Sequence, residues 1–374
     1  MKIYKIGIIG YGGFGKFLHH WWDKLENVEI IAISDSRYRG INTEKYRIYT
    51  DWRSLIMADD IDIVSIVTPP SFHAEMAIEA MRAGKHVLLE KPVATTNGDA
   101  KRILEAQKET GKMIAVDHML RYDPIIQVIA DISNKNILGP LRHAEVSNYA
   151  QDNSLSPDHW FWDELMSGGI LIEHGVHFFD LINAMTTQKV IKVSGSSHHR
   201  NKQQRDQVSA LVSYDGGLIV SHYHAFSGPG FFEKTTIRLI YDLARIEIEG
   251  WVPMKGKVEA LVNESIKSEL ENLPGWKINQ INDVDHLEDV SRPEGWGEDE
   301  EEKRLISVYG INYDVNEVLS GSFEIGRTKS EVYGKCLQDM INDLIAKIEN
   351  PNHKIIANLE NAIESLRIAT LASK

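Results

Sequence analysis

The chain has 374 residues, with 41 lysines and arginines, 54 aspartates and glutamates, and a formal net charge of −13 at pH 7. This length allows two domains with sizeable cores. The acidic balance argues against nucleic acid or an anionic membrane as a partner. A single cysteine, Cys336, excludes an internal disulfide and gives no zinc or redox motif. Without a signal peptide pattern or a long apolar run, the sequence predicts a cytoplasmic protein.

A glycine-rich turn stands close to the start of the chain. Residues 3–9 are typical of a buried strand, and the segment Gly10-Tyr11-Gly12-Gly13-Phe14-Gly15 follows directly before a helix. In this setting G-x-G-x-x-G predicts a dinucleotide site. Gly10 permits the tight turn, Gly12 lets the backbone approach a pyrophosphate, and Gly15 allows close helix–strand packing. The phosphates would accept hydrogen bonds from the free N–H groups at the helix start.

An acidic residue follows at the spacing that such a site needs. Asp35 lies 20 residues after Gly15, at the end of a second predicted strand, 28–34. Its carboxylate would accept hydrogen bonds from the ribose hydroxyls of NAD and repel the 2′-phosphate of NADP. Arg37 and Arg39 are close enough in sequence to bind that phosphate. We therefore predict NAD, with NADP as the less favoured alternative.

The first third of the chain alternates between strand and helix patterns. After Asp35 we expect a short helix at 52–58, a strand at 61–67, a helix at 72–83, a strand at 86–89, a helix at 99–110 and a strand at 113–116. This alternation predicts a doubly wound parallel sheet, a Rossmann α/β domain, over residues 1–122. Ligands of such sheets bind at the carboxyl ends of the strands. Thr68-Pro69-Pro70 and Glu90-Lys91-Pro92 follow two of these ends.

The pattern changes after Asp123-Pro124. A helix at 125–132 precedes strand-like segments at 141–149, 190–198, 207–214, 218–225, 235–241 and 244–249, with a hairpin turn at 215–217. We expect residues 123–374 to form an α+β domain, in which a mostly antiparallel open sheet carries helices, including one at 171–184, on one face. The last fifty residues predict two helices separated by Pro351. The segment 251–326, with its acidic run Glu298–Glu302, gives no clear pattern.

These motifs together resemble the glucose–fructose oxidoreductase/inositol dehydrogenase family, written Gfo/Idh/MocA. The resemblance rests on the glycine turn, on Thr68-Pro69-Pro70 with His73, on Glu90-Lys91-Pro92, on Arg121-Tyr122-Asp123-Pro124, and on Ser167-Gly168-Gly169 leading to His177. It implies that Lys91 and His177 line a substrate pocket beside the nicotinamide. Two positions depart from the family pattern, because Glu173 replaces an aspartate and Ile170 replaces a third glycine. The cofactor-binding residues that we expect are Gly10, Gly12, Gly13, Phe14, Gly15, Asp35, Ser36, Arg37, Thr68, Pro69, Pro70, His73, Glu90 and Lys91.

The chemistry of alcohol oxidation suits the same residues. Neutral His177 can act as the general base that takes the hydroxyl proton. Lys91 can stabilise the developing alkoxide. Glu173 stands four residues before His177, so a helix would place both on one face, where the carboxylate would orient the imidazole or share a substrate hydroxyl.

Further polar and aromatic residues are candidates for binding a sugar. We expect this substrate wall to include His118, Arg121, Tyr122, Trp160, Trp162 and His174. His222 and His224 either reach the pocket or, as we favour, lie half-buried in the sheet. A metal held by Glu173, His174 and His177 is an alternative that helical spacing permits, but we predict no metal because no further ligand is placed by a motif.

We predict from these observations a NAD-dependent oxidoreductase acting on a secondary hydroxyl of a sugar, sugar derivative or cyclitol. One alternative is a hydrolase or lyase that retains NAD and oxidises its substrate transiently. Another is a non-catalytic NAD-sensing regulator, against which the presence of Lys91 and His177 argues. Both faces of the strand 207–214 carry uncharged residues, so we also expect a homodimer or homotetramer built through the open sheet.

Overall fold

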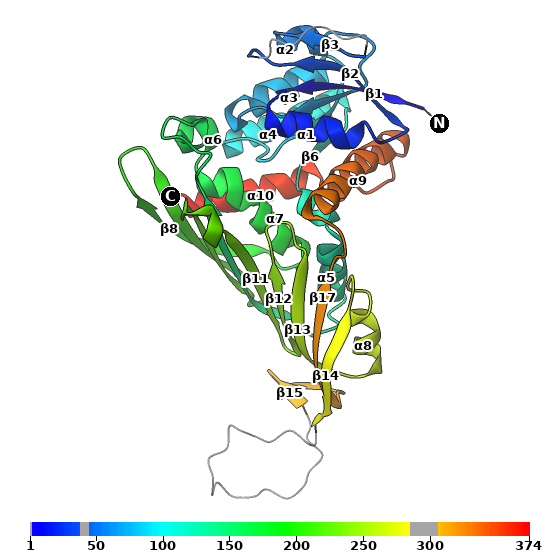
Figure 1. Cartoon of the computed structure of the whole chain (residues 1–374), viewed down its shortest axis with the longest axis vertical. Helices are drawn as coiled ribbons and strands as arrows, with labels where there is room; N and C mark the ends of the chain where they lie inside the picture. The colour runs from blue at the N-terminus through cyan, green and yellow to red at the C-terminus, as the bar shows by residue number, and fades with distance from the viewer. Residues whose placement is uncertain (1, 38–44, 285–305) are drawn as a thin grey trace, which may run out of the picture.

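A six-stranded parallel sheet forms the N-terminal part of the molecule (Figure 1). The computed structural model describes residues 2–37, 45–284 and 306–374. The strand order is β3-β2-β1-β4-β5-β6. The strands are β1 (Tyr4–Ile9), β2 (Val28–Ser34), β3 (Arg47–Tyr49), β4 (Ile63–Ile66), β5 (His86–Leu89) and β6 (Ile114–Val116). The central strands are buried on both faces, which explains their continuous runs of isoleucine, valine and leucine. The predicted Rossmann sheet is confirmed.

Helices cover this sheet on both sides. They are α1 (Gly13–Trp22), α2 (Trp52–Ile56), α3 (His73–Arg82) and α4 (Asn97–Thr110). The bounds of α4 follow from local chemistry, since the Thr96 hydroxyl accepts a hydrogen bond from the Asp99 amide at the start and Gly111 adopts φ +67° at the end. The strand order reverses between β1 and β4, and this switch point is where ligands of doubly wound sheets bind.

A nine-stranded sheet forms the second half, in the order β14-β17-β13-β12-β11-β7-β10-β9-β8. Its strands are β7 (Leu141–Gln151), β8 (Val190–His199), β9 (Arg205–Tyr214), β10 (Ile219–Gly228), β11 (Lys234–Tyr241), β12 (Ala244–Glu249), β13 (Lys255–Val262), β14 (Lys277–Asp283) and β17 (Glu317–Glu324). Every pair is antiparallel except β7 with β10. The predicted antiparallel sheet is confirmed, and so is the turn at 215–217.

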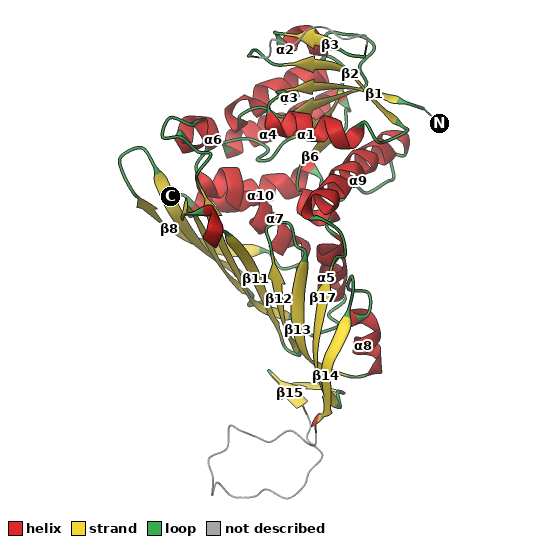
Figure 2. Ribbon diagram, in the orientation of Figure 1, coloured by secondary structure: helices red, strands yellow, loops and turns green. Residues whose placement is uncertain are grey.

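Helices pack on one face of this sheet and leave the other open (Figure 2). The covering helices include α5 (Pro124–Asn134), α7 (Val176–Ala184) and α10 (Leu359–Ala372). In β9 the residues Val208, Ala210 and Val212 are buried toward the helices, whereas Leu211 is 48% exposed on the open face. The predicted one-sided arrangement is therefore present.

The helix expected at 171–184 differs in detail. Its first part, Leu171–Gly175, is a π-helix, and α7 begins only at Val176. A short helix α6 (Glu164–Ser167) and the turn at Gly168 and Gly169, with φ +83° and +87°, precede it. The wider π turn rotates Glu173 relative to His177, so their spacing of four residues no longer places them as in a regular α-helix.

The segment 251–326 contains more structure than its sequence indicates. It provides β13, β14 and β17 of the large sheet, the helix α8 (Glu264–Leu270), and a small hairpin of β15 (Ile306–Val308) with β16 (Ile311–Tyr313). The acidic run Glu298–Glu302 lies outside the described residues. Within the described part of the chain, no helix is both long enough and apolar enough to cross a membrane.

The last two helices cross back to the N-terminal half, α9 (Lys329–Glu349) against α1 and α10 against α4 (Figure 1). The indole N–H of Trp22, on α1, donates to the Leu337 carbonyl at 3.1 Å. Gly334 of α9 lies so close to Trp21 that a Cβ there would be 2.0 Å from the ring. The predicted domain boundary at 122/123 falls between the 3-10 turn Met119–Tyr122 and α5, while α9 and α10 join the two halves.

Candidate active site

The glycine turn forms a cradle at the start of α1. A Cβ on Gly10 would lie 2.2 Å from the Val67 carbonyl, and one on Gly15 would lie 2.2 Å from the Gly10 carbonyl. These two glycines are therefore required by close backbone packing. Gly12 and Gly13, in contrast, face open space, and they line a cavity of about 910 Å³, the main cavity. Phe14 lines it as well. The arrangement fits a pyrophosphate beside the free N–H groups that begin α1.

One end of the main cavity carries the residues expected around an adenosine. Asp35, Ser36 and Arg37 line it together with Trp52 and Arg53. The Asp35 carboxylate is held in place, because it accepts hydrogen bonds from the amides of Tyr11 at 3.0 Å and Arg37 at 2.8 Å. Each carboxylate oxygen keeps a second lone pair for a ribose hydroxyl. Arg39 lies outside the described residues.

The Thr68-Pro69-Pro70 segment lines the main cavity, whereas His73 stands behind that wall. His73 is fully buried, with Nδ1 2.7 Å from the Pro92 carbonyl and Nε2 2.8 Å from the Thr68 carbonyl. Burial lowers the pKa of His73 to about 4. It therefore connects the two loops that follow β4 and β5, and the structure gives it no direct place around a cofactor.

The other end of the main cavity contains an ion pair between Lys91 and Glu173. The Lys91 ammonium donates to the Glu173 Oε1 at 2.7 Å and to the Glu173 main-chain carbonyl at 2.7 Å. The side chains are only 13% and 14% exposed. The sequence predicted that Glu173 would orient His177 or bind substrate with it, but the structure directs this carboxylate to Lys91. The π turn is the physical reason, since it changes the direction in which Glu173 points.

Two histidines complete this end of the cavity. His174 and His177 both line it, with ring centroids 6.2 Å apart. Burial, reinforced by the charge of Lys91, lowers the pKa of His174 to about 3 and that of His177 well below 6.5. Both imidazoles are therefore neutral at pH 7. The His177 Nδ1 is buried and has no hydrogen-bond partner among the described residues, which leaves Nε2 as the nitrogen available to a substrate.

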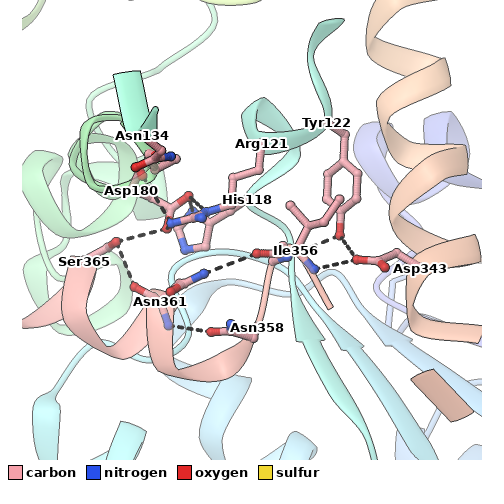
Figure 3. A network of polar contacts seen from close by, with 12 residues as sticks. His118, Arg121, Tyr122, Asn134, Asp180, Asp343, Ile356, Asn358, Asn361 and Ser365 are labelled. Carbon is pink, nitrogen blue, oxygen red and sulfur yellow. Dashed lines mark hydrogen bonds and ion pairs between the residues drawn. The ribbon is translucent and has the colours of Figure 1, made fainter. Parts of the chain in front are cut away.

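Most of the expected sugar-binding wall lies elsewhere. Trp160 and His174 line the main cavity, whereas His118, Arg121, Tyr122 and Trp162 do not. Figure 3 shows the reason for three of these: Arg121 donates to Asp180 at 2.6 and 3.0 Å, His118 lies 3.7 Å from the same carboxylate, and the Tyr122 hydroxyl donates to Asp343 at 2.6 Å. Asp180 is buried, so it requires these positive and polar neighbours.

Trp162 also makes contacts within the protein. Its indole N–H donates to the Leu155 carbonyl at 3.4 Å, and the Arg200 guanidinium lies 4.8 Å from the centroid of its ring. His222 and His224 are fully buried in the sheet, outside the cavity lining. Across residues 2–37, 45–284 and 306–374, no three histidine, cysteine or acidic side chains converge as metal ligands would.

Several residues of the main cavity were not predicted from the sequence. The most informative are Asp117, Gln151, Trp251 and Tyr333. Asp117 follows β6, so the rule that sites gather at carboxyl ends of parallel strands would have found it. Trp251 and Tyr333 carried no such signal. Trp251 comes from the segment 251–326, whose sequence gave no clear pattern, and Tyr333 comes from α9, some 240 residues after Lys91 in the chain.

Comparison with known proteins agrees with this geometry. Residues 4–118 match the family model described as oxidoreductase family, NAD-binding Rossmann fold, and residues 126–246 match the GFO/IDH/MocA C-terminal domain. The chain belongs to the Gfo/Idh/MocA family. The resemblance predicted from the motifs is thus confirmed.

Among curated relatives, the chain is 26% identical over 267 residues to 1-carboxy-3-chloro-3,4-dihydroxycyclohexa-1,5-diene dehydrogenase of Comamonas testosteroni, covering 68% of this chain and 62% of that protein. It is 35% identical over 127 residues to inositol 2-dehydrogenase of Salmonella agona, covering 32% and 38%. It is 27% identical over 198 residues to a glycosyl hydrolase family 109 protein of Shewanella baltica, covering 47% and 43%. The matches thus span between 38% and 62% of the length of these relatives.

Solved structures share the fold over the whole chain. UDP-N-acetylglucosamine 3-dehydrogenase GnnA from Acidithiobacillus ferrooxidans has a TM-score of 0.70 at 16% identity, covering 100% of this chain and 97% of that one. GenD2 from gentamicin A biosynthesis, solved in complex with NAD, has a TM-score of 0.73 at 18% identity, covering 100% and 94%. At these identities the likeness concerns the fold. It supports the two-sheet architecture described above.

Proposed function

We propose that this protein is an NAD-dependent dehydrogenase that oxidises a secondary hydroxyl of a sugar, a sugar derivative or a cyclitol. The observation that carries the proposal is a single cavity, which holds the glycine cradle at one end and Lys91, Glu173 and His177 at the other. The cyclic substrates in the names of the dehydrogenase relatives support the choice of a sugar or cyclitol.

The bound nicotinamide would supply the hydride acceptor, and the protein must then remove the hydroxyl proton. Neutral His177 suits this task through Nε2. Its low pKa keeps the imidazole unprotonated but makes it a weak base, so the proton that it takes must pass on quickly. Two N–H groups of Lys91 are used by Glu173, which leaves one to donate to the substrate oxygen as negative charge develops there.

We propose NAD rather than NADP as the cofactor because of Asp35. Its carboxylate is fixed at the cavity edge by two amides, where it would bind a ribose diol and repel a 2′-phosphate. Arg37 lines the same end, where its positive charge would attract a 2′-phosphate and so reduce the preference for NAD.

A second candidate is a hydrolase or lyase that retains its cofactor and oxidises the substrate only transiently. The similarity to glycosyl hydrolase family 109 proteins favours keeping it. It would use the same cradle and the same Lys91. The two candidates differ in their products, because only a dehydrogenase releases reduced cofactor in proportion to turnover.

Absorbance at 340 nm tests the proposal most directly. The protein is mixed with a panel of sugars, polyols and inositols and with NAD or NADP in parallel. We expect net NADH formation with at least one member. Turnover of a glycoside without net NADH would favour the second candidate, and binding of NAD without either reaction on any substrate would favour a regulator.

We further propose a cytoplasmic homodimer or homotetramer joined through the open face of the large sheet. That face carries the apolar side chains Leu211 (48% exposed) and Ile219 (45%), which association would remove from water. Light scattering at micromolar concentration should give at least the dimer mass, and a monomer mass would contradict the arrangement.

A further inference from the structure

Two carboxyl groups lie side by side at the base of the main cavity. Glu90 follows β5 and Asp117 follows β6, directly after the paired residues Leu89 and Val116. The Asp117 amide continues the ladder by donating to the Leu89 carbonyl at 2.8 Å. Parallel register therefore brings both side chains to the same edge of the sheet. Both line the cavity, and Asp117 is only 2% exposed while Glu90 keeps part of its surface open to the cavity.

The contact between these groups requires a proton. Neither oxygen of Asp117 has a donor partner among the described residues, and the Met119 amide faces it short of hydrogen-bond geometry. The Glu90 carboxyl group is nevertheless its neighbour, because the pairing of β5 with β6 places the two residues side by side. Two carboxylates would repel each other, whereas one carboxylic acid can donate to one carboxylate. Burial and the neighbouring charge of Asp117 raise the pKa of Glu90 well above its ordinary value.

We conclude that the pair holds one shared proton at neutral pH and carries one negative charge. The other titratable groups that face the pair come from several elements: Lys91 after β5, Glu173 from the π turn, Tyr122 from the turn before α5, and Tyr333 and Cys336 from α9.

Only two of these facing groups are charged at neutral pH. Burial raises the pKa of Tyr122, Tyr333 and Cys336, so all three are neutral. Lys91 and Glu173 pair at 2.7 Å and largely cancel. Among the described titratable groups that face the carboxyl pair, none therefore balances its single negative charge.

We propose that Glu90 and Asp117 together favour the oxidised nicotinamide over the reduced one, because the oxidised ring carries a positive charge and the reduced ring does not. The proposal rests on the NAD-dependent function proposed above. A cation next to the pair makes its shared proton easier to lose. Binding of NAD⁺ should therefore release protons from the pair, and binding of NADH should not.

Isothermal titration calorimetry at pH 8 in two buffers of different ionisation enthalpy measures this release on the whole protein. For the native protein we expect more protons released with NAD⁺ than with NADH. Asp117→Asn or Glu90→Gln should reduce that difference, because the remaining carboxyl group no longer has a neighbouring carboxylate to raise its pKa. Either variant should still prefer NAD⁺, since one carboxyl group that can ionise remains.

Replacing both carboxyl groups removes the charge itself. In Glu90→Gln/Asp117→Asn the ratio of the NAD⁺ and NADH dissociation constants should shift by about tenfold against NAD⁺, the scale of one partly screened charge at short range. Asp131→Asn, which removes an exposed carboxylate from α5, serves as the matched control and should leave both the ratio and the proton count unchanged.

Equal proton release with the two cofactors in the native protein would overturn the proposal, and so would an unchanged ratio in a folded double variant. The native measurement stands even if the double variant does not fold, which circular dichroism would reveal. If neither NAD⁺ nor NADH binds the native protein, and NADP⁺ and NADPH behave likewise, the proposed function itself fails. Binding of both with equal proton counts removes only the role of the carboxyl pair.

Discussion

Replacing Lys91 by methionine should separate its role in the reaction from its role in the fold. The substitution keeps an unbranched side chain that is one atom shorter, but it removes the charge and both hydrogen bonds to Glu173. Because the pair is only 13% and 14% exposed, Glu173 is left as a largely buried, unpaired carboxylate. Breaking a buried pair in this way costs about 3 kcal/mol of folding stability, which corresponds to a fall in Tm of roughly 4 °C for a chain of this size.

The catalytic loss has a different origin. One N–H group of Lys91 would no longer face the alkoxide, and loss of one such donor lowers kcat by a factor of about 10² or more. NAD affinity should change much less. Removing the charge also raises the pKa of His177, since Lys91 is one of the groups that lower it.

The double variant Lys91→Met/Glu173→Gln distinguishes the two contributions. It leaves no unpaired charge, so most of the lost stability should return, while kcat should stay at the level of the single variant. Thermal unfolding and steady-state kinetics on the native protein and the two variants provide the measurements. Recovery of kcat together with Tm would show that Lys91 acts only through the fold and would refute the mechanism.

Three further predictions follow from the same geometry. The acid limb of the pH profile of kcat/KM should lie below pH 6.5, because the pKa of His177 is lowered. His177→Ala should depress kcat, with partial recovery at high pH. An acid limb above pH 7 would contradict the assignment of His177 as the general base. The native protein should prefer NAD over NADP at least tenfold and Asp35→Ala should narrow the preference, so equal catalytic efficiencies of the native protein would exclude the assignment. Burial lowers the pKa of His73, His174 and His222, so below pH 6.5 the unfolded chain binds protons that the folded chain does not, and stability should fall by about 1.4 kcal/mol per pH unit for each such histidine; a Tm that is constant from pH 7 to pH 5 would argue against their burial as neutral groups.

The Rossmann half was predictable because its signals are local. The glycine turn, Asp35 and the apolar runs each report on a stretch of a few residues, and parallel strands buried on both faces give continuous hydrophobic segments. Because ligands bind at the carboxyl ends of parallel strands, Thr68 and Lys91 could be predicted to lie in one cavity without any knowledge of side-chain contacts.

The remainder depended on contacts between distant segments. Strands β13, β14 and β17 all lie within the segment 251–326, whose sequence gave no clear pattern. The role of Glu173 depended on a π turn, which the sequence pattern did not distinguish from a regular helix. Arg121 was expected to bind the substrate. It instead donates to the buried carboxylate of Asp180, which needs a cation beside it.

The return of α9 to the N-terminal half has a consequence for how the protein is made. Trp22 is completely buried, yet its indole partner Leu337 is synthesised more than 300 residues later. At ordinary rates of translation the ribosome needs on the order of tens of seconds to cover that distance. During this interval the nascent Rossmann half exposes an aromatic surface on α1 that no later strand covers. We therefore expect ribosome-bound chains that stop before Lys329 to recruit chaperones and to be cleaved readily near Trp21, whereas protease resistance of such chains would show that the first half completes its core alone.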